Sequence, residues 1–445
     1  MADLLPDLIN EVVASDPSQN NDTVAATIAA TDPESIALLL ESVPLEQRLQ
    51  SWQQVPTTKK LAVLVEMRGD PRITLIEATD DNEFDTIFQD VDAEQLLELS
   101  DSLPSKLIDL ALAAMGKQQR QYFKDASQFT DSQIGHWLNH DILILPLNAK
   151  VRDGLSLLRR DVSATTDCIF LINRTGQYSA SIKLSSLYGA PEHIPLTELT
   201  EPYIDIIKAD QDAVQASREV QNSGFVALPV VDDNNKLLGK VDMITACELV
   251  NEDYERQVMS SAGMTEDEDL FSSVRSSARK RAIWLGINLV TAFLASWFIG
   301  LFEATLQEVV ALAVLMPVVA SMGGIAGSQT LTLIVRGLAL KQVTSSNRNA
   351  LLEKELKVGI LNGFIWAIVV GCIAYFWFDS YLLGAVIAIA ILLNIIMAAI
   401  TGVLLPVILS KLKIDPALSG SVILTTVTDI VGFVVFLGLG SLLLL

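Results

Sequence analysis

One carboxylate stands in the middle of the last apolar stretch of this chain. Residues 419–445 are long and apolar enough to cross a bilayer, and Asp429 lies near their centre. A charged side chain at that depth costs about 3 kcal/mol on insertion scales, and such residues are usually functional. Ser421, Thr425 and Asp429 are spaced at i, i+4 and i+8, so their oxygen atoms share one helix face.

No Lys or Arg lies at a similar depth, so the Asp429 carboxylate must be protonated, hydrated or facing a cation. A water-filled cation path fits this pattern. The alternative is that Asp429 and the neighbouring threonines only bond adjacent helices.

A second polar stretch, PVVASMGGIAGSQTLTLIVRG, occupies residues 317–337 of another apolar segment. Its proline and glycines either expose backbone carbonyls to a polar cavity or, through the Gly323–Gly327 pair, allow close helix packing. Carbonyls and one aspartate provide only oxygen ligands, which suit hard cations such as magnesium or calcium. One acid per chain cannot neutralise a divalent ion, whereas two chains about a twofold axis supply two copies of Asp429.

Five apolar stretches of helical length are present, at 282–302, 309–335, 358–378, 382–409 and 419–445. Basic residues lie before the first stretch, between the second and third, and between the fourth and fifth. The other connections hold Glu303, Glu308 and Asp379 and no base. By the positive-inside rule, the N-terminus is expected in the cytoplasm and the C-terminus outside.

The net charge of −22 belongs entirely to the region before these spans. Seven of the 53 acidic and seven of the 31 basic residues lie from Ala282 onward, so the first 281 residues carry 46 acids against 24 bases. Such a surface disfavours nucleic acid and attracts cations. Because the sequence has no nucleophile–base pairing, phosphate loop or zinc cluster, we do not expect an enzyme.

The soluble region divides into two patterns. Residues 1–135 place breakers near every twelfth position, with short amphipathic runs between them, which predicts a stack of short helices. Residues 168–187 and 226–249 then repeat a strand–turn–strand–helix pattern, with turns at Asn173 and Asp232. A basic stretch, 269–284, is predicted to form a helix that enters the first span.

Taken in order, these features resemble the MgtE family of magnesium channels, most specifically in PVVASMGGIAGSQ and TTVTDIVGF. The resemblance covers nearly the whole chain, and the paired repeats are similar to CBS domains. It implies a multidomain membrane protein, a homodimer in the bacterial inner membrane with one pore on the twofold axis. Its parts are expected to be an α-superhelical N domain (1–135), a tandem α/β CBS-like pair (136–255), a linking helix (256–281) and a five-span pore domain (282–445).

The resemblance also implies roles for particular residues. Asp429 matches the family's pore aspartate, with Thr425 and Gly432 beside it, and Ser321 and Gly324 fall on the pore face of the second span. It implies passive Mg2+ influx that stops when cytosolic Mg2+ bridges acidic faces of the soluble domains. Candidate regulatory ligands are Asp232, Asp242, Glu248, Glu252 and Asp253. The acidic surface agrees, because its self-repulsion relaxes when a divalent cation screens it.

Three departures from the family pattern keep alternatives open. Ile325 replaces the usual asparagine of GGNAG, so a broader divalent cation (Co2+, Mn2+) channel or an exchanger is one alternative. Ile244 and Thr245 stand where an acidic pair is usual, and both repeats lack the Ser/Thr-x-x-Asp pattern of nucleotide-binding CBS domains, which disfavours ATP. A non-conducting membrane sensor is the alternative of a different class, and it would have no need of Asp429.

Overall fold

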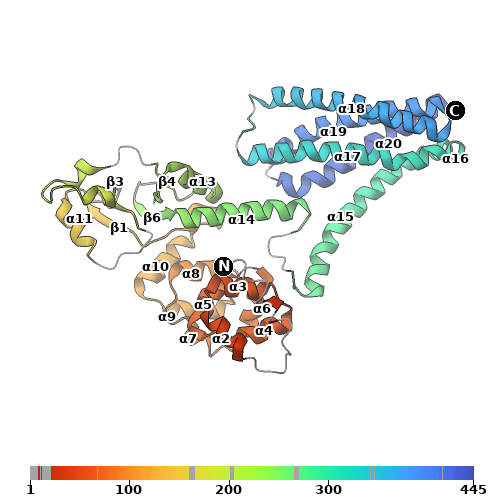
Figure 1. Ribbon diagram of the computed structural model, residues 1–445. Helices are drawn as coiled ribbons and strands as arrows, with labels where there is room; N and C mark the ends of the chain where they lie inside the picture. The colour runs from red at the N-terminus through yellow and green to blue at the C-terminus, as the bar shows by residue number, and fades with distance from the viewer. Residues whose placement is uncertain are drawn as a thin grey trace. The chain divides into compact units, whose positions relative to one another are not determined.

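The computed structural model describes residues 9–10, 12, 22–67, 69–159, 166–200, 205–264, 270–340, 342–344, 346–412 and 414–445, with only the backbone at 22–25 and 418. These residues form two compact units (Figure 1). The first contains the chain up to Arg256, and the second contains everything from Val274 to the C-terminus.

The first unit opens with short helices that follow the predicted twelve-residue step. Helices α3 to α6 begin at residues 33, 45, 57 and 69, and α8 to α10 begin at 93, 105 and 117. The breakers sit where the sequence predicts them, with Pro44, Pro56 and Pro104 directly before α4, α5 and α9. The helices are α2 (Asp22–Ala30), α3 (Pro33–Glu41), α4 (Leu45–Gln54), α5 (Thr57–Glu66), α6 (Gly69–Ala78), α7 (Phe84–Ile87), α8 (Ala93–Leu99), α9 (Ser105–Ala114) and α10 (Lys117–Ala126).

Apolar faces of these helices bury one continuous core, in which Ile36, Leu64 and Phe84 are fully enclosed. Each helix is too short to be stable alone in water, so this shared burial holds the stack together.

Two α/β repeats follow, and their sheets have the same topology. In each sheet the first strand pairs parallel to the second, and the second pairs antiparallel to the third. After η1 (Ile134–His136), the first repeat contains β1 (Leu143–Pro146), α11 (Val151–Leu157), β2 (Cys168–Ile172), β3 (Tyr178–Lys183), α12 (Leu184–Leu187) and η2 (Leu196–Leu199). The second contains β4 (Ile207–Lys208), α13 (Ala213–Ser223), β5 (Ala227–Val231), β6 (Leu237–Asp242) and α14 (Met243–Ser261).

The segment predicted as a linking helix, 256–281, contains the end of one helix and the start of another. Helix α14 extends to Ser261, and α15 (Val274–Gly300) begins at Val274 and continues as the first span. The predicted basic helix therefore starts five residues later than 269, and the domain boundaries themselves stay predictions.

The second unit contains the five predicted spans, each confirmed as a helix long and apolar enough to cross a membrane. Helix α19 lies at the centre and packs against α17, α18 and α20, whereas α17 and α18 touch little (Figure 1). Helix α15 is nearly all exposed in the single chain, with only Ala295 buried. The remaining helices are α16 (Glu303–Glu308), α17 (Val310–Ala339), α18 (Arg348–Phe378), α19 (Tyr381–Lys411) and α20 (Pro416–Leu444).

Helix α17 is continuous through its proline and glycines, so of the two alternatives that the sequence leaves open the irregular segment is not observed. Close packing explains the glycines instead. A Cβ on Gly323 would lie 2.2 Å from Nδ2 of Asn394, and a Cβ on Gly327 would lie 3.0 Å from the Leu424 side chain. Asn394 is fully buried on α19 and donates a 2.9 Å hydrogen bond to the Val319 carbonyl of α17, so this amide joins two spans.

This packing predicts different effects at two adjacent glycines. Gly323→Ala should destabilise the membrane unit by about 1–3 kcal/mol, because the new methyl group collides with the buried Asn394 amide. Gly324→Ala should be neutral or slightly stabilising, because a Cβ there meets nothing within 4 Å. Thermal unfolding of both variants in the same detergent tests the difference, and equal melting temperatures would contradict the packing.

Candidate functional site

The carboxylate of Asp429 lies half-buried near the middle of α20. Within the described part of the chain it makes no hydrogen bond or ion pair. Thr425, one turn earlier, is exposed, and its hydroxyl donates to the Ser421 and Val422 carbonyls at 3.0 Å. The two residues therefore offer oxygen atoms on a face that the single chain leaves open.

The neighbouring face of α17 carries Ser321 and Gly324. Ser321 is exposed, and open space surrounds the position of a Cβ on Gly324. Helices α17 and α20 pack against each other through Gly327 and Leu424. The structure thus places Ser321 and Gly324 on an open face of one helix and Thr425 and Asp429 on an open face of its neighbour.

Gly432 is placed differently from the other candidate membrane residues. It is buried, and a Cβ there would lie 2.7 Å from Nδ2 of Asn394 and 3.1 Å from Val319. Gly323 meets the same amide from α17. Gly323 of α17 and Gly432 of α20, one turn after Asp429, therefore both pack against the buried Asn394 side chain.

Sequence reasoning missed a second acid among the membrane helices. Glu355 is 5% exposed, although the third apolar stretch was expected to start only at residue 358. Helix α18 begins at Arg348, so Glu355 lies two turns inside it. Its carboxylate accepts a hydrogen bond from Thr330 of α17 at 3.2 Å and pairs with Lys354 at 2.5 Å.

A cavity of about 560 Å3 in the first unit is walled by carboxylates from the short helices and from α14. Two of the five candidate regulatory residues, Glu248 and Glu252, line it. Among the described residues, no three His, Cys, Asp or Glu side chains converge closely enough to hold a bare metal ion. A cation there would be attracted by the summed field and held through its own water shell. The other acids of this acidic cavity are Glu34, Glu66, Asp92, Glu94, Glu98 and Glu255.

The other three candidate regulatory residues make local structural contacts. Asp232 accepts hydrogen bonds from the backbone of Asn234 and Lys236 at 2.8 Å, which closes the β5–β6 turn. Asp242 is buried and accepts from the Thr245 backbone at 3.0 Å, in the first turn of α14. Asp253 pairs with Arg218 at 3.1 Å.

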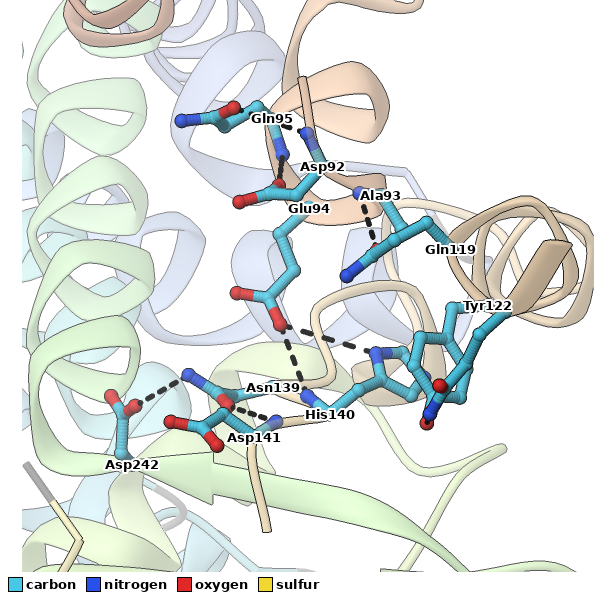
Figure 2. Close-up of polar contacts among 11 residues, drawn as sticks. Asp92, Ala93, Glu94, Gln95, Gln119, Tyr122, Asn139, His140, Asp141 and Asp242 are labelled. Atoms are coloured by element: carbon cyan, nitrogen blue, oxygen red, sulfur yellow. Dashed lines mark hydrogen bonds and ion pairs between the residues drawn. The ribbon is translucent and has the colours of Figure 1, made fainter. Parts of the chain in front are cut away.

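The short helices and the α/β repeats meet where Glu94 of α8 contacts His140, as Figure 2 shows. The Glu94 carboxylate accepts the His140 backbone N–H at 3.0 Å and lies 4.0 Å from its Nδ1, while the His140 ring stacks on Tyr122 with 4.1 Å between centroids. Next to it, Asn139 exchanges two backbone hydrogen bonds with Lys240 of β6 and donates to Asp242 at 3.3 Å. A chain of polar contacts therefore connects α8 with the start of α14.

Glu94 should make the stability of this junction depend on pH. Burial of its carboxyl group raises its pKa to about 7, although 46% of the side chain stays exposed. The folded protein therefore binds a proton between pH 4.5 and 7 that the unfolded chain does not. Stability should rise as the pH falls from 8 to 6.5, with a melting temperature about 2 °C higher, because partial exposure moderates the effect.

Glu94→Gln should remove this increment, whereas Glu77→Gln, at an exposed acid of α6, should keep it. Scanning fluorimetry of the full chain in magnesium-free buffer measures both. The pH range in which stability increases ends near pH 6.5, because burial lowers the pKa of His140. Below that pH the unfolded chain protonates His140 more readily than the folded protein does, which opposes the gain from Glu94. An unchanged pH slope in Glu94→Gln would contradict the assignment.

Comparison with known proteins finds family matches in both the membrane region and the N-terminal helical region. The MgtE family model, described as a divalent cation transporter, matches residues 316–439, and the model of the MgtE intracellular N domain matches residues 31–132. A Bacillus subtilis protein named magnesium transporter MgtE is 24% identical over 425 residues, which cover 94% of this chain and 93% of that protein. This chain belongs to the MgtE family.

A magnesium transporter MgtE from Thermus thermophilus is 26% identical over 323 residues, covering 72% of this chain and 71% of that protein. The MgtE match over 316–439 includes Ser321, Gly324, Thr425, Asp429 and Gly432. The N-domain match over 31–132 runs from α3 to α10.

Two solved structures also resemble parts of this MgtE-family chain. The CBS pair domain of a putative Mg2+ transporter from Shewanella oneidensis is 31% identical and covers 38% of this chain and 98% of that one, with a TM-score of 0.33. The cytosolic domain of the Mg2+ channel MgtE, in complex with ATP, is 16% identical and covers 56% of this chain and 100% of that one, with a TM-score of 0.47.

Proposed function

We propose that this protein conducts Mg2+ passively across the bacterial inner membrane and closes when cytosolic Mg2+ occupies its acidic soluble region. The observation that carries the proposal is the pair of open, oxygen-bearing faces on two helices packed against each other. Thr425 and Asp429 lie on one of them, and Ser321 and Gly324 lie on the other. Oxygen ligands without nitrogen or sulfur suit Mg2+.

The functional form in this proposal is a homodimer. A single Asp429 supplies one negative charge, and a twofold axis beside α17 and α20 would bring a second copy to the same ion. Because Mg2+ gives up water reluctantly, the carboxylates and hydroxyl groups need only contact its hydration shell. The exposed faces of α15, α17 and α20 in the single chain leave room for both a second copy and the surrounding lipid.

We place the N-terminus in the cytoplasm and the C-terminus outside. The connection between α17 and α18 and the one between α19 and α20 hold bases, whereas those on the other side hold Glu303, Glu308 and Asp379. In this orientation the acidic cavity faces cytosolic Mg2+. Its eight acidic side chains repel one another until a divalent cation screens them, which links ion concentration to the separation of the short helices from α14 across the cavity. Nucleic acid is not an expected partner of such a surface.

A channel for several divalent cations is the second candidate, and Ile325 is the observation that favours it. This side chain is 57% exposed and offers no oxygen atom where the family usually has an amide. Loss of one ligand type reduces the site's ability to reject ions that shed water more readily than Mg2+ does.

Uptake into proteoliposomes tests the proposal. The purified protein should carry Mg2+ down its gradient, uptake should fall as internal Mg2+ rises, and Co2+, Mn2+ and Ca2+ should compete weakly. Strong competition by Co2+ or Mn2+ would favour the broader channel. Absence of uptake by folded protein at every internal Mg2+ concentration would favour a sensor.

A further inference from the structure

A second cavity, of about 550 Å3, opens between α17 and α18 with α19 as its floor. Near the connection between α17 and α18 its walls are polar, with Gln329, Thr330, Lys354 and Glu355. Toward the middle of the helices they are largely apolar, with Ile325 and Trp366 among them. This volume is many times that of one water molecule, about 30 Å3, so the space is too large for a packing void.

The polar end has unused hydrogen-bond donors. Lys354 pairs with buried Glu355 but is 58% exposed, and an ammonium group has three donors. In the described part of the chain, the side-chain amides of Gln329 and Asn362 have no hydrogen-bond partner, and both line the cavity. Asn362 lies seven residues beyond Glu355, about 10 Å deeper along α18.

A further positive charge, that of Arg336, lies on the cavity side of α17 near the opening of the cavity. Lys354 and Glu355 neutralise each other, but Arg336 follows Gln329 and Leu333 at i+7 and i+3 and so shares their face of α17. Arg336 is exposed and lies at the end of α17 nearest the connection to α18.

This face meets the proposed conduction face at Ile325, which lines the cavity and lies one turn after Ser321. The other α17 residues of the cavity include Met322, Ala326, Gln329 and Leu333, whereas Ser321 and Gly324 do not line it. At 3.6 residues per turn, the two groups are separated by roughly 140° around the helix. The centre of the cavity therefore lies away from Ser321 and Gly324, and Ile325 stands between the two faces.

We propose that this cavity binds one anionic phospholipid of the cytoplasmic leaflet. The phosphate would contact Lys354 and Arg336, the ester carbonyls would accept from the amides of Gln329 and Asn362, and one acyl chain would lie along Ile325 and Trp366. Basic residues between helices at the cytoplasmic end of a bundle recognise anionic headgroups in this way. The assignment to that leaflet rests on the proposed orientation. A lipid in the cavity would also fill the space between α17 and α18, which hardly touch each other, and so stabilise the packing of these two helices.

Trp366 provides a direct reporter of what occupies the cavity. The full-length protein is reconstituted in bilayers of phosphatidylcholine with rising fractions of brominated phosphatidylglycerol, and the Trp366 signal is the difference between wild type and Trp366→Phe. Half-maximal quenching should need at least about fivefold less brominated phosphatidylglycerol than brominated phosphatidylcholine. Trp377 lies at the far end of the same helix and is 67% exposed. Its quenching, obtained from the difference between wild type and Trp377→Phe, should be equal for the two brominated lipids.

Arg336→Gln should reduce the preference at Trp366, and Arg336→Lys should retain it. Equal quenching of Trp366 by both lipids would mean bulk lipid only and would overturn the proposal. Quenching by iodide from the aqueous phase would mean a water-filled cavity, and resistance to every quencher would mean that a second copy of the chain covers it; either result overturns the proposal. The fluorescence measurement requires no transport, so its failure and the failure of the proposed channel function are distinguishable.

Discussion

Replacing Asp429 by asparagine should reduce Mg2+ uptake by roughly 100-fold or more. Two unit charges 4 Å apart attract by about 4 kcal/mol at an effective dielectric constant of about 20, and the substitution removes one such charge from each protomer. The carboxamide keeps the size of the side chain and one oxygen atom, so the loss would be due to charge. Because Asp429 has no ion-pair or hydrogen-bond partner among the residues that the structure describes, the variant should fold normally.

Asp415 provides the matched control for this substitution. It precedes α20, and its carboxylate accepts the Ala417 backbone N–H at 2.8 Å. Asparagine is an equally good capping residue, so Asp415→Asn makes the same chemical change next to the same helix without removing the cap. Wild-type uptake is expected from it in the same proteoliposome assay. Normal uptake by Asp429→Asn would exclude Asp429 from the conduction path.

The sequence predicted the elements well where local patterns decide them. The step of twelve residues in the first unit is set by Pro44, Pro56 and Pro104, which cannot continue a helix and so begin the next one. The five spans follow from hydropathy, and the paired repeats follow from matching turns at Asn173 and Asp232. Both turn residues bond the backbone two and four positions later, which explains why either Asn or Asp serves.

Features that depend on tertiary contacts were not predictable in this way. For Pro317 and Gly323 the sequence left an irregular helix and close packing both open, and the choice depends on the contact of Gly323 with Asn394 from a distant span. Glu355 was missed because the helix extends ten residues beyond its apolar part, and Thr330 together with Lys354 accommodates the charge.

The regulatory acids show the same difference between local pattern and tertiary position. Asp232, Asp242 and Asp253 were candidates because the family resemblance implies regulatory acids in and after the second repeat, and each is bonded to a turn, a helix start or an arginine. The acidic cavity instead collects residues from positions 34 to 255, more than two hundred residues apart in sequence. Only the fold brings Glu34 and Glu66 near Glu248 and Glu252.

Neutralising the acidic cavity should therefore uncouple the channel from cytosolic Mg2+. In the triple variant Glu94→Gln, Glu248→Gln, Glu252→Gln, we expect uptake to persist at internal Mg2+ that stops the wild type, with the half-inhibiting concentration raised at least about tenfold. The physical reason is that the carboxylates of the cavity supply the field that attracts the ion, and removing acids from both of its sides weakens that field. Uptake into proteoliposomes preloaded with graded Mg2+ measures the shift.

A control with the same number of substitutions separates local from general electrostatics. Glu77→Gln, Asp109→Asn and Glu198→Gln together replace three acids at exposed positions that do not line the cavity. If both triple variants shift inhibition equally, the cation acts by screening the whole acidic region. If neither shifts it, the regulatory ion binds elsewhere. A shift confined to the cavity variant would mean that closure depends on an ion held between the short helices and α14, because the acids removed come from both sides of that cavity.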